Sequence, residues 1–211
     1  MLTKTRAIIA GAAAAIALGP GATAAVATTA TTWTVTPGGP ATATLHHPGL
    51  AIFADLTANA YLDTCRTSHL TATLHPGAGQ PGRGIGQVTG LSLSRCFDRT
   101  TYTSSRYPWH LTALSYHPAT GTTTGRLSGI HLAYSTPGTP PCAGIVDGTS
   151  ATAHNGTIRF RYHNATHTLT FTRGGTLHLY HNTCPAPWHN GDQLAFGGSY
   201  TLTPAQAITS P

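Results

Sequence analysis

Alternation of apolar and polar side chains is the sequence feature that most limits how this chain folds. In the stretch "TIRFRYH", Ile158, Phe160 and Tyr162 alternate with polar or charged residues. The stretches "HLTATLH" (69–75) and "TLHLYH" (176–181) follow the same rule. Because successive side chains of a β-strand point to opposite faces of a sheet, this period of two predicts strands with one buried and one solvated face.

Turn-forming residues separate these alternating runs at short intervals. The sequence has "HNG" at 154–156, "NAT" at 164–166 and "RGG" at 173–175. Glycine and asparagine adopt the positive φ angles of tight hairpins at little cost. The pattern predicts an all-β fold, an antiparallel sandwich or barrel of roughly ten or more short strands.

Three segments are less regular. Residues 50–62 fit either a helix or two strands with a turn at Ala58-Asn59, and we favour the strands. The proline-rich stretch 136–142 is interpreted as a connection between two halves of the fold, because proline cannot sit in a central strand. The glycine-rich stretch 82–90 is interpreted as a mobile loop with close backbone packing, because no helix follows it to bind a phosphate.

The first residues indicate export. Lys4 and Arg6 precede the short apolar run "AIIAGAAAAIALG", and small residues follow it. This is the layout of a secretory signal peptide, which we place at residues 1–27. The run is shorter than the roughly 20 apolar residues of a membrane span, and no later stretch reaches that length. We therefore expect a secreted, extracellular protein whose residues 28–211 form one β domain without a membrane span.

Few charged side chains are available for chemistry or for nucleic-acid binding. Charged residues make up 8% of the chain, glutamate is absent, and the only lysine lies in the expected signal peptide. The arginines are scattered rather than gathered into a basic patch, so we expect no nucleic-acid partner.

Four cysteines fit an exported protein with two disulfides. Four cysteines allow three connectivities, and we favour Cys65–Cys96 with Cys142–Cys184 because each bond then ties one compact part of the chain. Paired close spacings typical of structural zinc sites do not occur.

Catalytic motifs are missing from the sequence. The serine-hydrolase pattern G-x-S-x-G is absent, and the five aspartates are the only carboxylate side chains. Asp63 and Asp98 lie next to Cys65 and Cys96, so a disulfide there would bring the two carboxylates together for acid–base work on a glycosidic bond. Asp147-Gly148 and Gly191-Asp192 are interpreted as ordinary turns.

The histidines and tryptophans offer weaker candidates. His163 and His167 flank a turn and His178 and His181 lie on the next strand, but His178 and His181 face opposite sides of it. We therefore expect no metal site. Trp109 begins an apolar run and is expected in the core, whereas Trp188 lies in a proline- and glycine-containing loop and is the candidate for surface binding.

Several motifs in order along the chain carry a family resemblance. They include "WTVTPGG", "PWHLTALSY", "CAGIVDGT", "YHNATHTL" and the closing "PAQAITSP". With these motifs the chain resembles a group of uncharacterised secreted proteins of Streptomyces and related actinobacteria. The resemblance implies a β fold and export, and it brings no catalytic residue or cofactor. The cysteine and Pro-Trp layout is also similar, more faintly, to the secreted activators of alkane oxidation of pseudomonads, which implies an accessory role toward a cell surface or an apolar substance.

These observations favour a secreted, disulfide-bonded β protein that acts as a non-catalytic surface-interaction or accessory protein. We expect neither a catalytic residue nor a cofactor. The expected partner is a cell-wall glycan or envelope surface. The alternative is a secreted hydrolase that uses the Asp63 and Asp98 pair.

Overall fold

The computed structural model describes residues 31–186 and 188–211. The expected signal peptide at residues 1–27 lies outside the described residues. No helix of the described residues has the length and apolarity needed to cross a membrane. The described residues form sixteen strands: β1 (Thr32–Thr36), β2 (Gly39–Leu45), β3 (Ala51–Asp55), β4 (Ala60–Leu74), β5 (Gly77–Pro81), β6 (Arg83–Cys96), β7 (Thr101–Thr103), β8 (Trp109–His117), β9 (Thr122–Ile130), β10 (Leu132–Thr136), β11 (Cys142–Asp147), β12 (Gly156–His163), β13 (Thr168–Gly175), β14 (Leu177–Tyr180), β15 (Gln193–Thr203) and β16 (Ala207–Thr209).

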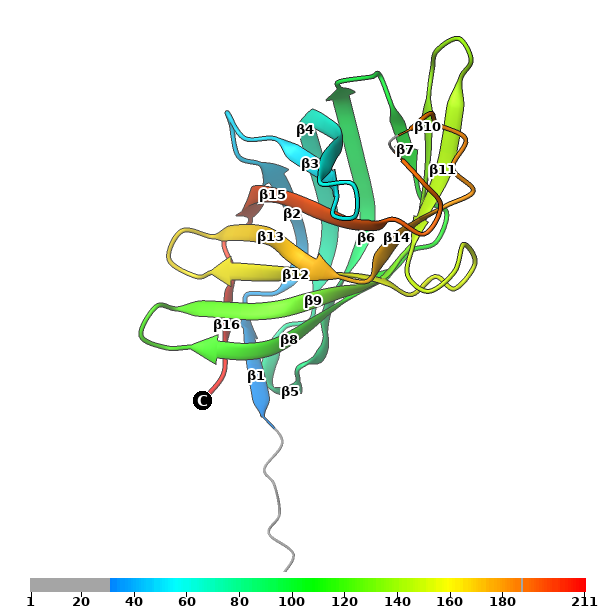
Figure 1. Cartoon of the computed structure of the whole chain (residues 1–211). Coiled ribbons are helices and arrows are strands. Elements are labelled where there is room, and N and C mark those ends of the chain that lie inside the picture. Colours follow the sequence, from blue (N-terminus) through cyan, green and yellow to red (C-terminus); the bar gives the residue numbers. More distant parts are fainter. Residues whose placement is uncertain (1–30, 187) are drawn as a thin grey trace, which may run out of the picture.

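Eight strands of this described part close into an antiparallel barrel (Figure 1). The order around the barrel is β13-β12-β9-β8-β6-β4-β2-β15, and pairing between β13 and β15 completes the ring. Closure joins the first and last strands of this order, which removes the two free edges that an open sheet would have. The predicted all-β antiparallel fold with more than ten strands is confirmed, in its barrel form.

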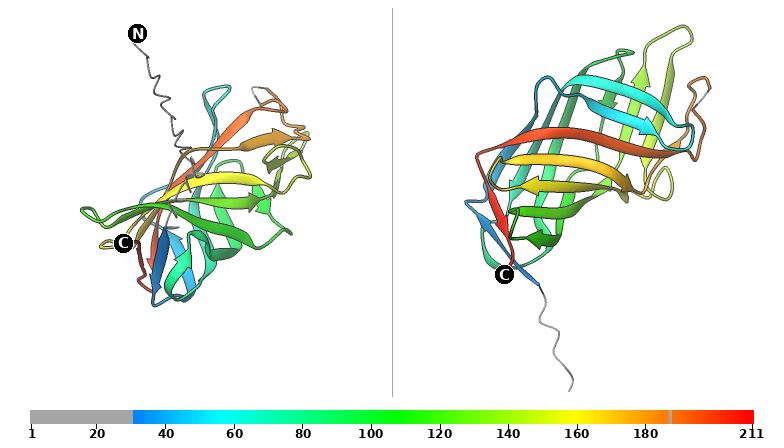
Figure 2. Two further views of the ribbon diagram at one scale, coloured as in Figure 1. Left: turned by 90° about the horizontal axis from the view of Figure 1, so that it is seen from below. Right: turned by 60° about the vertical axis from the view of Figure 1, so that its left-hand side comes forward.

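Three long strands, β4, β6 and β15, carry the sheet beyond the barrel (Figure 2). The outer half of β15 leaves β2 and pairs with β3, which also pairs with the outer half of β4. From β15 the sheet continues through β14, β11, β10 and β7, and β7 contacts β6. This outer extension places loops from distant parts of the sequence around one end of the molecule.

Side chains fill the interior of the barrel. Ile158, Phe160 and Tyr162 are buried, as their alternation predicts, and Trp109 is also in the core. Two internal cavities with apolar linings measure about 10 and 30 Å³. Spaces of that size hold at most one or two waters, and an apolar lining keeps them dry. These two cavities are too small for a ligand, which favours a binding site on the outer surface.

A small sheet of β16, β1 and β5 covers one end of the barrel (Figure 1, bottom). Its apolar side chains Trp33, Val35 and Ile208 are each less than 5% exposed. The Tyr162 hydroxyl donates to the Gln206 carbonyl at 2.7 Å, which ties this small sheet to β12. The C-terminal residues thus complete the core instead of trailing from it.

The irregular segments of the sequence receive definite structures. Residues 51–55 and 60–74 are strands, as favoured, and Asn59 in the turn between them has a φ of 52°. The interpretation of 136–142 as a connection between halves is wrong, because it is the turn of the β10–β11 hairpin. The interpretation of 82–90 as a loop is also wrong, because Arg83–Cys96 is strand β6 and its glycines allow close approach to β4.

The two disulfides connect the pairs favoured from the sequence. Cys65 and Cys96 are direct cross-strand partners on β4 and β6. Cys142, at the start of β11, is bonded to Cys184 in the segment that follows β14. No cysteine is free. Both bonds lie in the outer extension, so both border the same end of the molecule.

Candidate functional site

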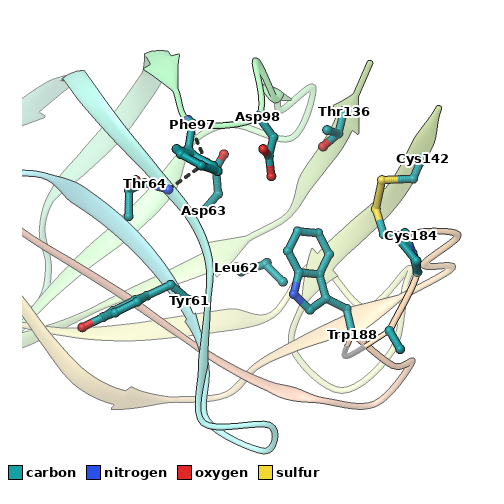
Figure 3. A pocket seen from close by; sticks show the side chains of 12 residues that line it. Tyr61, Leu62, Asp63, Thr64, Phe97, Asp98, Thr136, Cys142, Cys184 and Trp188 are labelled. Atoms are coloured by element: carbon teal, nitrogen blue, oxygen red, sulfur yellow. Dashed lines mark hydrogen bonds between the residues drawn. A yellow bond between two sulfur atoms is a disulfide. The ribbon is translucent and has the colours of Figure 1, made fainter. Parts of the chain in front are cut away.

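The largest hollow found on the described surface lies between the outer end of β4 and the Cys142–Cys184 disulfide. It has a volume of about 580 Å³ (Figure 3). Four separate segments supply its lining: the start of β4, the turn after β6, the two ends of the β10–β11 turn, and the segment after β14. Its lining residues are Tyr61, Leu62, Asp63, Thr64, Phe97, Asp98, Thr136, Cys142, Cys184, Pro185, Ala186 and Trp188.

Two further hollows share residues with this one. A hollow of about 380 Å³ shares Phe97 and Asp98 and adds Arg99. A hollow of about 260 Å³ shares Tyr61 and adds Arg173. We call the three together the groove. The shared residues place the three hollows next to one another, with one arginine in each of the two outer hollows.

Exposed aromatic rings mark the boundaries of the groove. The described residues include four large, exposed hydrophobic side chains, and both aromatic ones among them, Tyr61 (71% exposed) and Phe97 (83%), lie in the groove. Trp188 is half-buried against the core and lies on a different wall from Phe97 (Figure 3). Exposing such rings costs hydrophobic free energy, which is a usual sign of a binding surface. The expectation of Trp188 as a surface-binding candidate agrees with its position in the groove wall.

Asn182 holds the segment that carries Trp188. Its amide nitrogen donates to the Trp188 carbonyl at 2.8 Å, and its amide oxygen accepts from the Tyr134 hydroxyl at 2.6 Å and from the Cys184 N–H at 3.0 Å. Burial raises the pKa of Tyr134, so this hydroxyl keeps its proton and remains a donor. Sequence reasoning missed Asn182, because an asparagine in a loop gives no signal of long-range bonds.

The structure brings Asp63 and Asp98 to the same hollow, as their positions beside the disulfide suggested (Figure 3). Their environments differ. Asp98 is exposed. Asp63 is 4% exposed, and its carboxylate accepts bonds from the Thr64 N–H at 2.7 Å, the Phe97 N–H at 3.2 Å and the Tyr102 hydroxyl at 3.0 Å.

These bonds assign Asp63 a structural role. Burial, together with the negative charge of Asp63, raises the pKa of Tyr102 and keeps its hydroxyl protonated. A carboxylate with both oxygens engaged by fixed donors is a poor nucleophile or base, because a reaction there must first break those bonds. Asp63 therefore fixes the turn that presents Phe97, and Asp98 is left as a free hydrogen-bonding group.

A second pair of carboxyl groups, which sequence reasoning did not associate, lies beneath the Tyr61 end of the groove. Asp55 and Asp192 are 1% and 7% exposed. Asp55 Oδ1 accepts from the Thr57 and Ala58 N–H groups, both at 2.8 Å, while its buried Oδ2 meets no donor among the described residues. Burial, aided by hydrogen bonding to Asp192 and by its charge, raises the pKa of Asp55.

This arrangement predicts that Asp55→Asn stabilises the protein at neutral pH, by on the order of 1 kcal/mol. The folded state binds the Asp55 proton more tightly than the unfolded chain does. The resulting stability is complete below the ordinary pKa of 3.8 and is lost as pH rises through the raised folded value. Asparagine carries no charge at any pH, so the variant avoids the cost of burying a charged carboxylate. Urea unfolding at pH 4 and pH 7.5 checks this, with the exposed Asp98→Asn as control; a less stable Asp55→Asn variant at pH 7.5 contradicts it.

The histidines considered from the sequence do not gather into one site. His163 Nδ1 lies 3.2 Å from the Thr166 hydroxyl, His178 Nδ1 lies 3.0 Å from the Gly148 carbonyl, and His181 is exposed. Among the described residues, two clusters combine three potential metal-ligand side chains, and neither includes these histidines or His167. The cluster of Asp63, Cys65 and Cys96 offers no thiolate, because its cysteines form a disulfide.

Comparison of the chain with protein-family models, curated proteins and solved structures gives no match in any of the three. The functional interpretation therefore rests on the geometry of the groove.

Proposed function

We propose that this is a secreted, non-catalytic protein that binds a polysaccharide chain of the cell envelope in the groove. The observation that carries the proposal is a row of three adjacent hollows that share the exposed aromatic residues Phe97 and Tyr61. An extended polymer fits such a shape, since successive units occupy successive hollows. A compact ligand would use only one.

The side chains of the groove match the chemistry of sugars. A sugar ring has apolar C–H faces and a rim of hydroxyl groups, so it combines contact with an aromatic face with hydrogen bonds at its edge. Tyr61, Phe97 and Trp188 supply the faces. Asp98 accepts hydrogen bonds, and Arg99 and Arg173 donate them. The small number of charges favours a neutral chain over a strongly anionic one.

The alternative of a hydrolase is less well supported. Its two proposed carboxylates line one hollow, but Asp63 is held by three donors and is buried. A hydrolase would release soluble reducing sugar from cell walls, and Asp98→Asn would abolish the release.

Export is part of the proposal as well, since the two disulfides are compatible with an oxidising compartment.

Retention on insoluble polysaccharide tests the proposal. We expect Streptomyces cell walls to deplete the purified protein from solution, and Phe97→Ala and Trp188→Ala each to weaken retention by about tenfold, the effect of losing one hot-spot contact. Leu114→Ala is the matched control, because Leu114 is 57% exposed but lies outside the groove. Absence of retention, or equal retention by a Phe97→Ala/Trp188→Ala double variant, would overturn the proposal. Because Phe97 is 83% exposed, its replacement leaves the fold intact.

A further inference from the structure

A compact cluster of His131, Asp147 and His154 lies at the end of the β10–β11 hairpin opposite to the groove. His131 directly precedes β10 and Asp147 ends β11, so the pairing of these strands brings them together. His154 lies in the loop between β11 and β12 and folds back onto Asp147. The groove begins at Thr136, five residues further along, or about 17 Å in an extended strand. The cluster is therefore separate from the groove.

The potential metal-ligand atoms of the cluster converge. His131 Nδ1 lies 2.8 Å and His154 Nδ1 3.6 Å from the same oxygen, Asp147 Oδ2. One ligand atom from each of the three residues lies within 4.8 Å of the other two. The imidazole rings meet edge to face, with centroids 4.5 Å apart. Asp147 is completely buried, while the side chains of His131 and His154 are 14% and 34% exposed, so an ion could reach the cluster from the solvent side.

His154 supplies the observation that points to a ligand. Its Nδ1 atom is buried and has no hydrogen-bond partner among the described residues. Buried polar atoms are nearly always bonded, and 3.6 Å to Asp147 Oδ2 is too long for a hydrogen bond. In a tetrahedral zinc site with bonds of about 2.1 Å, two ligand atoms stand about 3.4 Å apart. The two separations from Asp147 Oδ2 bracket that value.

We propose that His131, Asp147 and His154 form a binding site for a divalent transition-metal ion of the Zn²⁺ type. Two imidazole nitrogens and one carboxylate oxygen are ligands that Zn²⁺ accepts, whereas Ca²⁺ and Mg²⁺ require six or more oxygens. Three protein ligands leave the fourth position to water. Binding places the remaining proton of His131 on Nε2, so that Nδ1 turns from donor to ligand.

The surrounding loop holds this ligand set in place. Asp147 Oδ1 accepts from the Gly148 N–H at 2.6 Å and the Asn155 N–H at 3.1 Å, which fixes the carboxylate and leaves Oδ2 toward the histidines. The His154 N–H donates to Oδ2 at 3.0 Å, and its backbone has a φ of 50°. Such outer bonds orient metal ligands and raise affinity. Sequence reasoning predicted no metal site, because His131 and His154 are far apart in the chain and follow no motif spacing.

Titration with zinc tests the site. Isothermal titration of Zn²⁺ into purified, untagged, EDTA-treated and dialysed protein is expected to give one ion per chain. His154→Asn and His131→Gln are expected to weaken binding by at least about tenfold. Asparagine is chosen at 154 because it tolerates positive φ. His181→Asn is the matched control, since His181 also has a φ of 50° but is exposed and lies outside the cluster.

The outcomes separate the site from general binding by surface histidines. Support consists of saturable 1:1 binding that is kept in His181→Asn and lost in both cluster variants, with no comparable binding of Ca²⁺. The absence of 1:1 binding, an equal loss in His181→Asn, or unchanged affinity in His154→Asn would each overturn the proposal. Thermal melts in EDTA verify that the variants are folded, and added Zn²⁺ is expected to raise the melting temperature of the wild type but not of His154→Asn.

Discussion

Replacing Asp147 with alanine is expected to lower the free energy of unfolding by about 3–5 kcal/mol in metal-free buffer. Asp147 is completely buried, and four donors bond to its carboxylate, from Gly148, Asn155, His154 and His131. Burial alone would raise the pKa of Asp147, but these bonds outweigh it and lower the pKa below its ordinary value. Alanine leaves all four donors without their acceptor. Urea unfolding at pH 7 with EDTA measures the loss.

Two variants make this prediction specific. Asp98→Ala removes an exposed carboxylate and is expected to change stability by no more than about 0.5 kcal/mol. Asp147→Asn keeps one acceptor oxygen for the Gly148 and Asn155 N–H groups, so its loss should be intermediate. A loss below about 1 kcal/mol for Asp147→Ala would show that water replaces the carboxylate, contrary to the burial observed.

The strands could be predicted because one side of each strand faces the core. Where a strand has a buried and a wet face, as from Ile158 to Tyr162, the pattern fixes which residues are buried. The pattern does not indicate which strands pair with one another in the sheet. That β4 pairs with β2 along one half and with β3 along the other is decided by packing between segments far apart in the chain. The glycine-rich start of β6 was predicted to be a loop, because glycine occurs both in turns and where two strands approach closely.

The candidate sites were predictable only where a covalent bond brought residues together. Asp63 and Asp98 come to one hollow because each lies near a cysteine of the same disulfide. The bonds that occupy Asp63 come from backbone groups and from Tyr102, which no sequence pattern associates with it. Asp147-Gly148 looked like an ordinary turn, since local sequence does not reveal that His131 and His154 close over it.

The packed interior and the charge-poor surface together explain where function can reside. The two cavities found among the described core residues are too small for a ligand, and we interpret the barrel strands as a frame for the loops at the outer end. With 8% charged residues, the surface has few ion pairs to order those loops. Disulfides and side-chain amides take over that role. The conformation of the loops that form the groove should therefore depend on disulfides more than on ion pairs.

Removing the Cys142–Cys184 bond is expected to lower the free energy of unfolding by about 4 kcal/mol and to abolish binding to cell walls in the protein that remains folded. The bond closes a ring with a sequence separation of 42, so reduction returns that much freedom to the unfolded chain. It also removes the covalent link between β11 and the segment that carries Trp188, which then depends on hydrogen bonds such as those between Thr183 and Ala143. A Cys142→Ser/Cys184→Ser double variant, studied by urea unfolding and by cell-wall retention below its unfolding midpoint, measures both effects.

The other disulfide provides the contrast that makes this prediction decisive. Cys65–Cys96 closes a ring of similar size, with a separation of 31, so its loss should cost nearly as much stability. Its cysteines, however, lie on β4 and β6, which remain paired from Thr67 and Ser94 onward, and Asp63 still holds the turn that presents Phe97. Binding should therefore survive in Cys65→Ser/Cys96→Ser and disappear in Cys142→Ser/Cys184→Ser. Equal binding by both double variants would mean that hydrogen bonds of Asn182 and Thr183 suffice to fix Trp188 and that the Cys142–Cys184 bond serves only stability.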